Sequence, residues 1–350
     1  MKSLEIDSVS MSYGQRRILD EVSLTVQEGE FVSLLGPSGC GKTTTLNVVG
    51  GFIRPTDGRV RVDGRDVTEL PPHRRDLAIV FQNYALFPHL TVRDNVSYGL
   101  RARKVDRAQT VERVETVGRL LDISELMDRY PGQLSGGQQQ RVAVARSVVV
   151  RPGALLMDEP LSNLDVKLRK SIRVEFRKLQ RHLGQTVLFV TNDQEEALSM
   201  SDRIAVMRAG RVEQVGSATE LFEQPATAYV ADFMGVENIY PIHRDGSGHV
   251  AGNGVNPAAA AVDGHAAIGF RGRAVELSAS EHSGATSQHL NLGRMFVNAK
   301  TYLGESFRCD LVNQETGDEL VAELPAHAAD VEVGSFIWAR VPVSRVLKLR

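Results

Sequence analysis

The feature that most restricts how this chain can fold is a glycine-rich run, Gly36-Pro37-Ser38-Gly39-Cys40-Gly41-Lys42-Thr43. It fits the pattern G-x-x-x-x-G-K-[ST], in which glycines let the backbone curve around phosphate groups and point successive N–H groups inward. The apolar run Phe31–Leu35 precedes it and a helix is expected from Lys42, so the motif lies between a strand and a helix. A plain glycine-rich turn is the alternative for the motif alone, and this context disfavours it. The run therefore predicts a site for nucleotide phosphates.

Individual residues of this loop have distinct expected roles. Lys42 can reach the β- and γ-phosphates, and the Thr43 hydroxyl can bind Mg²⁺. The positive N-terminal end of the following helix adds to phosphate binding. Thr44, the next residue, is assigned to the same binding surface. The loop predicts a nucleotide with Mg²⁺, and it does not by itself distinguish a kinase, a GTPase or a transporter ATPase.

A pair of acidic residues, Asp158 and Glu159, follows a second apolar run at 154–157. An acid at the C-terminal end of a buried parallel strand lies beside the phosphate loop in this fold class. We expect Asp158 to hold Mg²⁺ through water and Glu159 to polarise an attacking water. An acidic pair that only ends a strand is the alternative interpretation.

The order of apolar and periodic segments predicts an α/β fold for the first part of the chain. Short apolar runs at 31–35, 154–157, 187–190 and 204–207 alternate with helical periodicity at 109–121, 137–150 and 165–183. This alternation is typical of a mainly parallel sheet covered by helices. Turn residues separate the segments 4–13, 18–26 and 58–62, which we expect to form added antiparallel strands.

The last third of the chain has a different pattern. Residues 244–265 are rich in Gly and Ala, which suggests loops, whereas 306–312 and 337–343 alternate apolar and polar residues as half-buried strands do. We expect a small β-rich domain there, with residues 1–235 forming the first domain and 236–350 the second.

Composition limits the classes of function. A length of 350 residues allows two domains. The formal net charge is −2, so no overall basic field favours nucleic acid, and no nucleic-acid partner is expected. The apolar runs are too short to span a bilayer, so membrane association is expected to come through a partner. Two cysteines, Cys40 and Cys309, do not make a disulfide framework and fit a reducing compartment.

The residues that separate the P-loop protein families are Leu134-Ser135-Gly136-Gly137-Gln138, followed by Gln139-Gln140-Arg141. This run resembles the signature of the ABC ATPases, and Ser135 lies 23 residues before Asp158, as in that family. The serine and glycines begin a helix whose free N–H groups can face a phosphate. The resemblance implies that they face the ATP held by a second copy, so two copies would pair head to tail.

Three further positions match the family. Tyr13 resembles the aromatic residue that stacks on adenine, and Gln82 resembles the glutamine that senses Mg²⁺ and the attacking water. Asp165 ends a segment, 161–165, that resembles the loop crossing the dimer interface. The resemblance covers nearly all of residues 4–235. It implies an α/β P-loop nucleotide-binding domain with an antiparallel β subdomain and a helical subdomain, followed by an all-β, OB-like (TOBE) domain.

One position departs from the family pattern. Asn192 stands where the family has a histidine that holds the γ-phosphate and the attacking water together. An amide still donates a hydrogen bond but is shorter and cannot become cationic. Losing one such donor could cost on the order of 10²–10³ in rate. Three alternatives stay open for Asn192. It slows hydrolysis, it traps an ATP-bound state as a natural or engineered change, or a neighbouring residue compensates fully for the missing histidine.

The resemblance implies an ATP-binding, ATP-hydrolysing subunit that energises solute import. The expected partners are a second copy, two integral membrane permease subunits and a periplasmic or lipid-anchored solute-binding protein. The expected location is the cytoplasmic face of the bacterial inner membrane, reached through the permeases. Polyamine or ferric iron is the expected solute, with sugar, glycerol phosphate or phosphonate as alternatives.

Two other functional classes remain. An ATP-binding regulatory subunit with little hydrolysis is kept open by Asn192. A non-transport ABC protein of translation or DNA repair usually has two cassettes or long coiled-coil insertions, and neither is evident here.

The junction at 233–239 resembles the entry to a regulatory domain, but Arg271-Gly272-Arg273 stands where the family usually has Arg-Pro-Glu. A domain serving only dimer contacts is therefore as plausible as a regulatory one.

Overall fold

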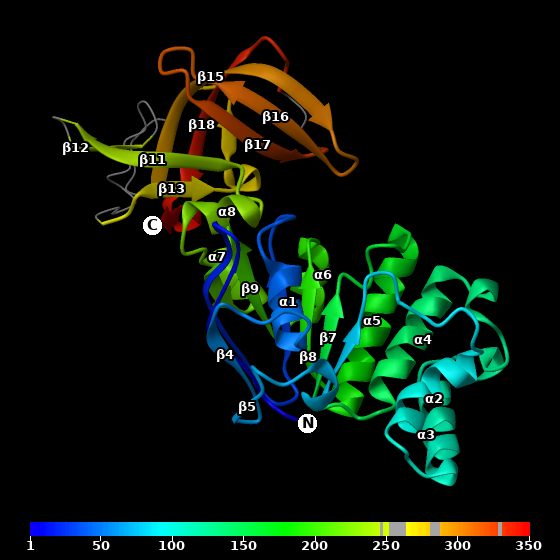
Figure 1. The fold of residues 1–350 in the computed structure, drawn as a ribbon. Coiled ribbons are helices and arrows are strands. Elements are labelled where there is room, and N and C mark those ends of the chain that lie inside the picture. The colour runs from blue at the N-terminus through cyan, green and yellow to red at the C-terminus, as the bar shows by residue number, and fades with distance from the viewer. Residues whose placement is uncertain (246–247, 252–263, 281–287, 328–330) are drawn as a thin grey trace. The chain divides into compact units, whose positions relative to one another are not determined.

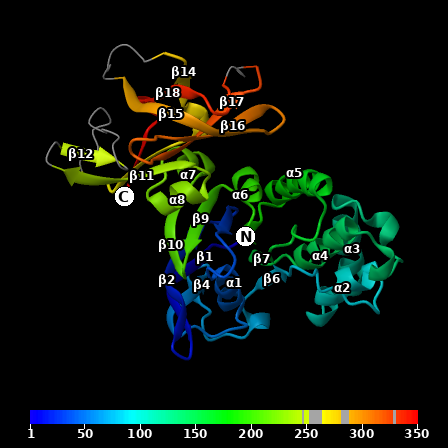
Figure 2. The ribbon, with the colours of Figure 1, turned by 90° about the horizontal axis from the view of Figure 1, so that it is seen from above.

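A computed structural model describes residues 1–245, 248–251, 264–280, 288–327 and 331–350. The chain divides into two compact units, Met1–Ala218 and Thr219–Arg350, each with its own sheets (Figures 1 and 2). The short helices α7 (Ala218–Glu223) and α8 (Ala228–Phe233) therefore fall almost wholly in the second unit. The functional boundary after residue 235 stays a prediction.

The centre of the first unit is a six-stranded sheet with the order β10-β9-β3-β8-β7-β6. Its strands are β3 (Phe31–Leu35), β6 (Leu77–Val80), β7 (Ala154–Asp158), β8 (Thr186–Thr191), β9 (Arg203–Arg208) and β10 (Arg211–Gly216). All neighbouring pairs are parallel except β9 with β10. Every residue of β3 and β8 is buried, as expected for parallel strands covered on both faces. The predicted α/β fold is confirmed.

A second, four-stranded sheet has the order β2-β1-β4-β5 and is antiparallel. Its strands are β1 (Leu4–Tyr13), β2 (Arg16–Val26), β4 (Asp57–Val62) and β5 (Arg65–Asp66). Apolar side chains of this sheet share one core with residues of β3, β8 and the first helix, for example Leu4, Leu34 and Leu188. This core fixes the strand that enters the glycine-rich loop.

Six helices belong to the first unit among the residues described. They are α1 (Lys42–Gly50), α2 (Val92–Ala102), α3 (Arg107–Leu120), α4 (Gly136–Val148), α5 (Val166–Leu183) and α6 (Gln194–Met200). α1 contacts β7 and β8, whereas α2, α3 and α4 pack on one another around Val96, Val114 and Val142 (Figure 1). This second group is the predicted helical subdomain, and none of the described helices is long and apolar enough to cross a membrane.

The second unit is strand-rich, as predicted. One sheet has the order β12-β11-β13-β19 and the other β14-β18-β15-β16-β17. The strands are β11 (Asn238–Asp245), β12 (Gly248–Ala251), β13 (Ala267–Phe270), β14 (Glu276–Ser278), β15 (His289–Tyr302), β16 (Ser306–Val312), β17 (Glu319–Pro325), β18 (Phe336–Pro342) and β19 (Leu347–Leu349). The prediction of loops from residue 244 is wrong for β12, because small Gly and Ala side chains hide strand alternation. Most of that stretch, 252–263, lies outside the described residues.

Candidate functional site

The glycine-rich loop joins the end of β3 to the start of α1, as the sequence predicts. Gly41 has φ 113°, a conformation that other residues rarely adopt, and a Cβ there would lie 2.7 Å from Leu19 Cδ2. A Cβ at Gly36 would lie 2.6 Å from the carbonyl oxygen of Met207. Neither position can carry a side chain without a shift of its surroundings, so glycine at both positions lets the loop pack closely against neighbouring segments.

Lys42 is nearly inaccessible, at 4% exposure, and its ammonium has three oxygen partners. It donates to the carbonyls of Gly36 at 2.8 Å and Pro37 at 3.0 Å, and to Asn192 Oδ1 at 2.6 Å. A buried cation requires such partners. The Cys40 sulfur lies 3.8 Å from Lys42 Nζ, and burial raises the pKa of this thiol. Cys40 is thus a free, buried residue of the loop.

Asp158 and Thr43 form the second contact of the site. The Thr43 hydroxyl donates to Asp158 Oδ1 at 3.1 Å, and burial raises the pKa of Asp158. A carboxylate beside a hydroxyl is an oxygen donor set that suits Mg²⁺. No cluster of three or more His, Cys, Asp or Glu able to hold a metal exists among the residues described.

Glu159 and Asn192 meet at the carboxyl ends of β7 and β8. Glu159 has φ 43°, and its N–H donates to the Val190 carbonyl at 3.0 Å, which turns the chain at this point. The Asn192 amide donates through Nδ2 to Glu159 Oε1. Because Oδ1 of the same amide accepts from Lys42, one side chain joins the predicted base to the predicted phosphate-binding lysine.

Gln82 approaches the same edge of the sheet through Ser162. Its Nε2 donates to Ser162 Oγ at 3.2 Å, and Ser162 Oγ donates to the Glu159 carbonyl at 2.9 Å. Asn163 Nδ2 in turn donates to the Gln82 carbonyl at 2.9 Å. The loop after β6 and the loop after β7 are therefore hydrogen-bonded to each other around the site.

The signature residues begin α4 away from this cluster. Ser135 Oγ accepts from the Gln138 N–H at 3.4 Å, and Gln138 Oε1 accepts from the Ser135 N–H at 3.0 Å, a capping box. A Cβ at Gly137 would lie 2.9 Å from Leu168 Cδ2, so a larger residue there would require the Leu168 side chain to move. Within the described part of the chain, no hydrogen bond joins residues 135–138 to the glycine-rich loop.

Tyr13 and Asp165 also lie outside the cluster. Tyr13 ends β1 with 54% of its surface exposed, so its ring is available to a planar ligand. Asp165 is the N-cap of α5, where its carboxylate accepts from the Leu168 N–H at 3.0 Å. The structure thus gives Asp165 a local capping role, and a role across a dimer interface stays a prediction.

Sequence reasoning missed an arginine beside the site. Arg169, in the first turn of α5, forms an ion pair with Asp193 at 3.2 Å and approaches Glu196 at 3.8 Å. Both acids follow β8, and Asp193 comes directly after Asn192. No local pattern in the sequence marked this contact, because Arg169 and Asp193 are 24 positions apart and lie on different elements.

Comparison with known proteins gives consistent results. Residues 19–162 match the ABC transporter family. The spermidine/putrescine import ATP-binding protein of Acidothermus cellulolyticus is 56% identical over 218 residues, covering 62% of this chain and 57% of that protein. The Bacillus cereus protein of the same name is 47% identical over 250 residues, covering 71% of this chain and 76% of that protein. An Fe(3+) ions import ATP-binding protein of Agrobacterium fabrum is 47% identical over 239 residues, covering 68% of each.

The solved structures include a dimeric ATP-binding cassette in a post-hydrolysis state, bound to ADP and Pi. It matches with a TM-score of 0.55 and 33% identity, covering 61% of this chain and 98% of that one. The chain spans little more than half the length of the Acidothermus relative.

Proposed function

This chain belongs to the ABC transporter family, in its group of import ATP-binding proteins, and from that premise we propose that it hydrolyses ATP to energise solute import. The observation that carries the proposal is the chain of contacts from Lys42 through Asn192 to Glu159, beside the Thr43–Asp158 pair. These contacts bring a phosphate-binding cation, a carboxylate that can act on water and an oxygen donor set to one edge of the sheet.

Each side chain has one task in this proposal. Lys42 and the loop N–H groups bind the phosphates, and Thr43 with Asp158 would hold Mg²⁺, which supplies positive charge to the phosphate oxygens. Glu159 accepts a proton from the attacking water or orients it. Asn192 holds the Glu159 carboxylate by a hydrogen bond, and Gln82 joins the site from the loop after β6. Tyr13 offers its exposed ring to the adenine.

The assembly that we propose contains two copies of residues 1–235. Ser135 and Gly136 are exposed at the start of α4, where free N–H groups can bind a phosphate held by the other copy. Asp165 lies near that surface. Residues 236–350 form the regulatory domain in this proposal, and two membrane permeases place the complex at the cytoplasmic face of the inner membrane. A solute-binding protein delivers the cargo.

The solute is proposed to be a polyamine, by analogy with the Acidothermus and Bacillus relatives, with ferric iron as the second candidate. The test reconstitutes the full chain with candidate permeases and binding protein in vesicles, and measures ATP hydrolysis and uptake of labelled spermidine, putrescine and Fe³⁺. Uptake that requires ATP and one of these solutes supports the proposal. A chain that binds no Mg-ATP and associates with no permease overturns it.

A second function, an ATP-binding regulatory subunit with little hydrolysis, is favoured by one observation. Asn192, which stands where the family resemblance implies a histidine, engages both Lys42 and Glu159. If this amide restrains the carboxylate, ATP would be held but turned over slowly. Hydrolysis by the complete complex below one ATP per hour, with tight ATP binding, would favour this second function.

A further inference from the structure

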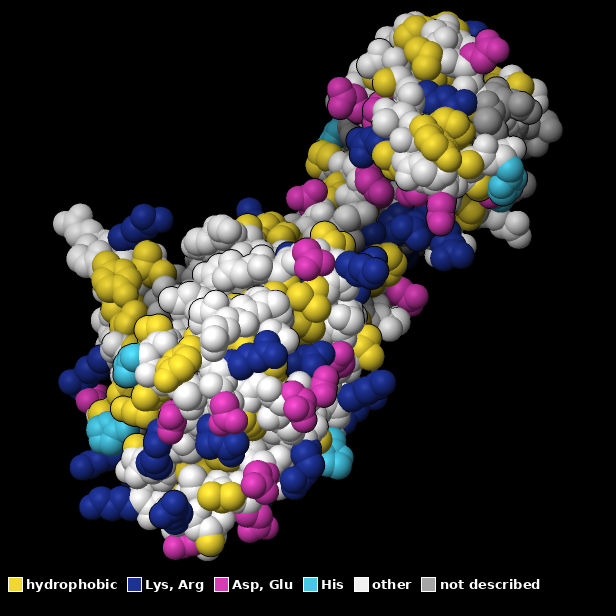
Figure 3. Space-filling model, turned by 90° about the vertical axis from the view of Figure 1, so that its right-hand side faces the viewer, with side chains coloured by type: hydrophobic (Ala, Val, Ile, Leu, Met, Phe, Trp, Pro, Cys, Tyr) yellow, Lys and Arg dark blue, Asp and Glu magenta, His cyan; other side chains and the backbone are white. Residues whose placement is uncertain are grey.

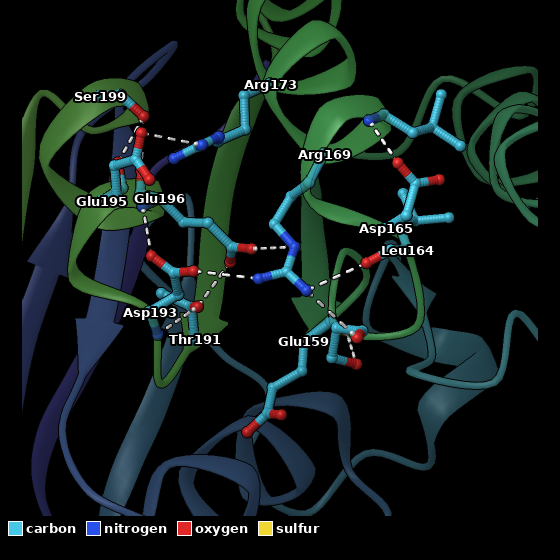
Figure 4. Close-up of polar contacts among 12 residues, drawn as sticks. Glu159, Leu164, Asp165, Arg169, Arg173, Thr191, Asp193, Glu195, Glu196 and Ser199 are labelled. Atoms are coloured by element: carbon cyan, nitrogen blue, oxygen red, sulfur yellow. Dashed lines mark hydrogen bonds and ion pairs between the residues drawn. The ribbon is translucent and has the colours of Figure 1, made fainter. Parts of the chain in front are cut away.

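Arg169 connects two loops that are far apart in the sequence. Its Nη2 donates to the Leu164 carbonyl at 3.1 Å and contacts the Ser162 carbonyl at 3.5 Å, while Nη1 donates to Asp193 Oδ2 at 3.2 Å (Figure 4). Ser162 and Leu164 lie after β7, and Asp193 lies after β8. One guanidinium therefore spans the segment that carries Ser162 and the segment that carries Asn192.

The loop after β8 is held on both sides of Asn192. The Thr191 hydroxyl donates to Glu196 Oε2 at 2.6 Å and accepts from the Asp193 N–H at 3.0 Å. Asp193 Oδ1 accepts from the Glu196 N–H at 3.1 Å. Arg169 completes this ring, because it pairs with Asp193 and lies 3.8 Å from Glu196 (Figure 4). Asn192 is thus the residue between two anchored neighbours.

Glu196 is a buried acid of this ring, and its charged form needs a cation nearby. It is 3% exposed, and burial raises its pKa, whereas the Thr191 hydrogen bond and the nearby arginines favour its charged form. A buried carboxylate needs such compensation. Arginine suits the position better than lysine, because its planar fork can engage acceptors on several sides at once.

We propose that Arg169 is a positioning residue for hydrolysis, which holds residues 162–164 against residues 191–193 and so fixes Asn192 relative to the Glu159 carboxylate. Among the residues described, no hydrogen bond or ion pair joins Arg169 to Asn192 or to Glu159. Arg169 acts on Asn192 through Asp193, the next residue in the chain. It acts on Glu159 through Ser162, whose carbonyl contacts Arg169 and whose hydroxyl donates to the Glu159 carbonyl. This inference rests on the proposed ATP hydrolysis.

The chain offers a matched control one helical turn later. Arg173 also lies on α5 and pairs with Glu195 of α6 at 3.1 Å. It is more buried than Arg169, with 6% against 24% of the side chain exposed. No hydrogen bond from Arg173 to residues 162–164 or to Asp193 exists in the described structure. If such an arginine only stabilised the fold, replacing Arg173 should therefore destabilise the protein at least as much as replacing Arg169.

The test compares the full chain with its R169Q, R169K, R173Q and R173K variants. Thermal unfolding, the Kd of a fluorescent ATP analogue, and kcat and KM for Mg-ATP are measured for each protein. For R169Q we expect kcat to fall about tenfold or more, with Kd and KM changed less than about twofold, because binding contacts stay in place. R169K should give a smaller loss in kcat. R173Q should keep kcat within about twofold, even if it lowers the melting temperature more.

A double-mutant cycle adds a measurement that global destabilisation does not mimic. Asp193→Asn keeps an oxygen for the Glu196 N–H but removes the charge that pairs with Arg169. If the two side chains act as one link, the double variant should lose no more kcat than R169Q alone. The inference would be overturned if the kcat losses of R169Q and Asp193→Asn multiplied in the double variant. Equal kcat losses in R169Q and R173Q would also overturn it. Hydrolysis by the unmodified chain is established first, since its absence counts against the proposed function and not against this link.

Discussion

Asn192 Oδ1 lies 2.6 Å from the ammonium of Lys42, although the two residues are 150 positions apart in the sequence. The other end of the same amide donates to Glu159. A single uncharged side chain therefore occupies the space between the phosphate-binding lysine and the predicted base. The chemistry of residue 192 is the first property of this site to test.

Replacing Asn192 by histidine should raise the ATP hydrolysis rate of the assembled complex by about tenfold or more, because an imidazole can reach farther and become cationic. The rate is measured at saturating Mg-ATP. Asn192→Gln is the matched control, since it lengthens the amide without adding charge. Equal rates for the histidine variant and the unmodified protein would reject the idea that this position limits turnover.

Glu159→Gln should abolish most hydrolysis and preserve nucleotide binding. General-base catalysis contributes about 10²–10⁴ in rate, so kcat should fall by at least about 10² while the Kd for Mg-ATP stays within about threefold. Glu175→Gln, which alters an acid paired with Arg141 on the surface, should leave kcat unchanged. A Glu159→Gln variant that retains half of the activity would show that another group activates the water.

The stability of nucleotide-free protein should depend on pH through Asp158. Burial raises its pKa above the usual 3.8, so the folded state binds this proton more tightly than the unfolded state does. Ionised Asp158 therefore lowers stability at neutral pH, and the loss diminishes as pH falls through the raised pKa toward 3.8. Asp158→Asn should be more stable than the unmodified chain at pH 7, and the difference should shrink at lower pH.

Thermal unfolding at several pH values from about 8 down to about 4 checks this dependence, with Asp128→Asn as the control because Asp128 is 92% exposed. Mg²⁺-dependent ATP binding should be lost in Asp158→Asn at every pH. A difference in stability that stays constant with pH would contradict the assigned role of the buried carboxylate.

Asn238 should matter for the stability of the second unit. It is 3% exposed, donates to the carbonyls of Val321 at 2.9 Å and Phe270 at 3.3 Å, and accepts from the Val321 N–H at 2.7 Å. Asn238→Ala leaves several of these buried groups unpaired, so the free energy of unfolding should fall by about 2 kcal/mol or more.

Tryptophan fluorescence can follow this loss in the second unit alone. The only tryptophan of the sequence, Trp338, lies in β18. Denaturant unfolding monitored at this residue should shift to lower concentration in Asn238→Ala and stay in place in Lys348→Ala, an exposed position of β19. An unchanged midpoint for Asn238→Ala would mean that water replaces the lost hydrogen bonds.

Local patterns were sufficient to predict the strands and helices around the site. The strand 31–35, the loop after it and the helix from Lys42 depend on apolar runs and glycines that are neighbours in the sequence. The meeting of Asp158 with Thr43 also follows, because both lie at the carboxyl edge of one parallel sheet.

The contacts between the loops could not be predicted in the same way. Arg169 reaches Asp193 because α5 lies between β7 and β8, and the distance across this connection depends on packing that no local pattern encodes. The strand β12 escaped prediction because Gly and Ala carry too little hydrophobic contrast to show a period of two. On the face that Figure 3 shows, Lys and Arg side chains are mixed with Asp and Glu side chains.

The three oxygen partners of Lys42 have a consequence for ligand affinity. Its three N–H donors bond to the carbonyls of Gly36 and Pro37 and to Asn192 Oδ1. A phosphate oxygen that bonds to Lys42 must replace one of these acceptors. The free energy gained is therefore the difference between the new hydrogen bond and the one that is lost. The gain in nucleotide affinity from Lys42 is then smaller than a count of its hydrogen bonds to phosphate would suggest.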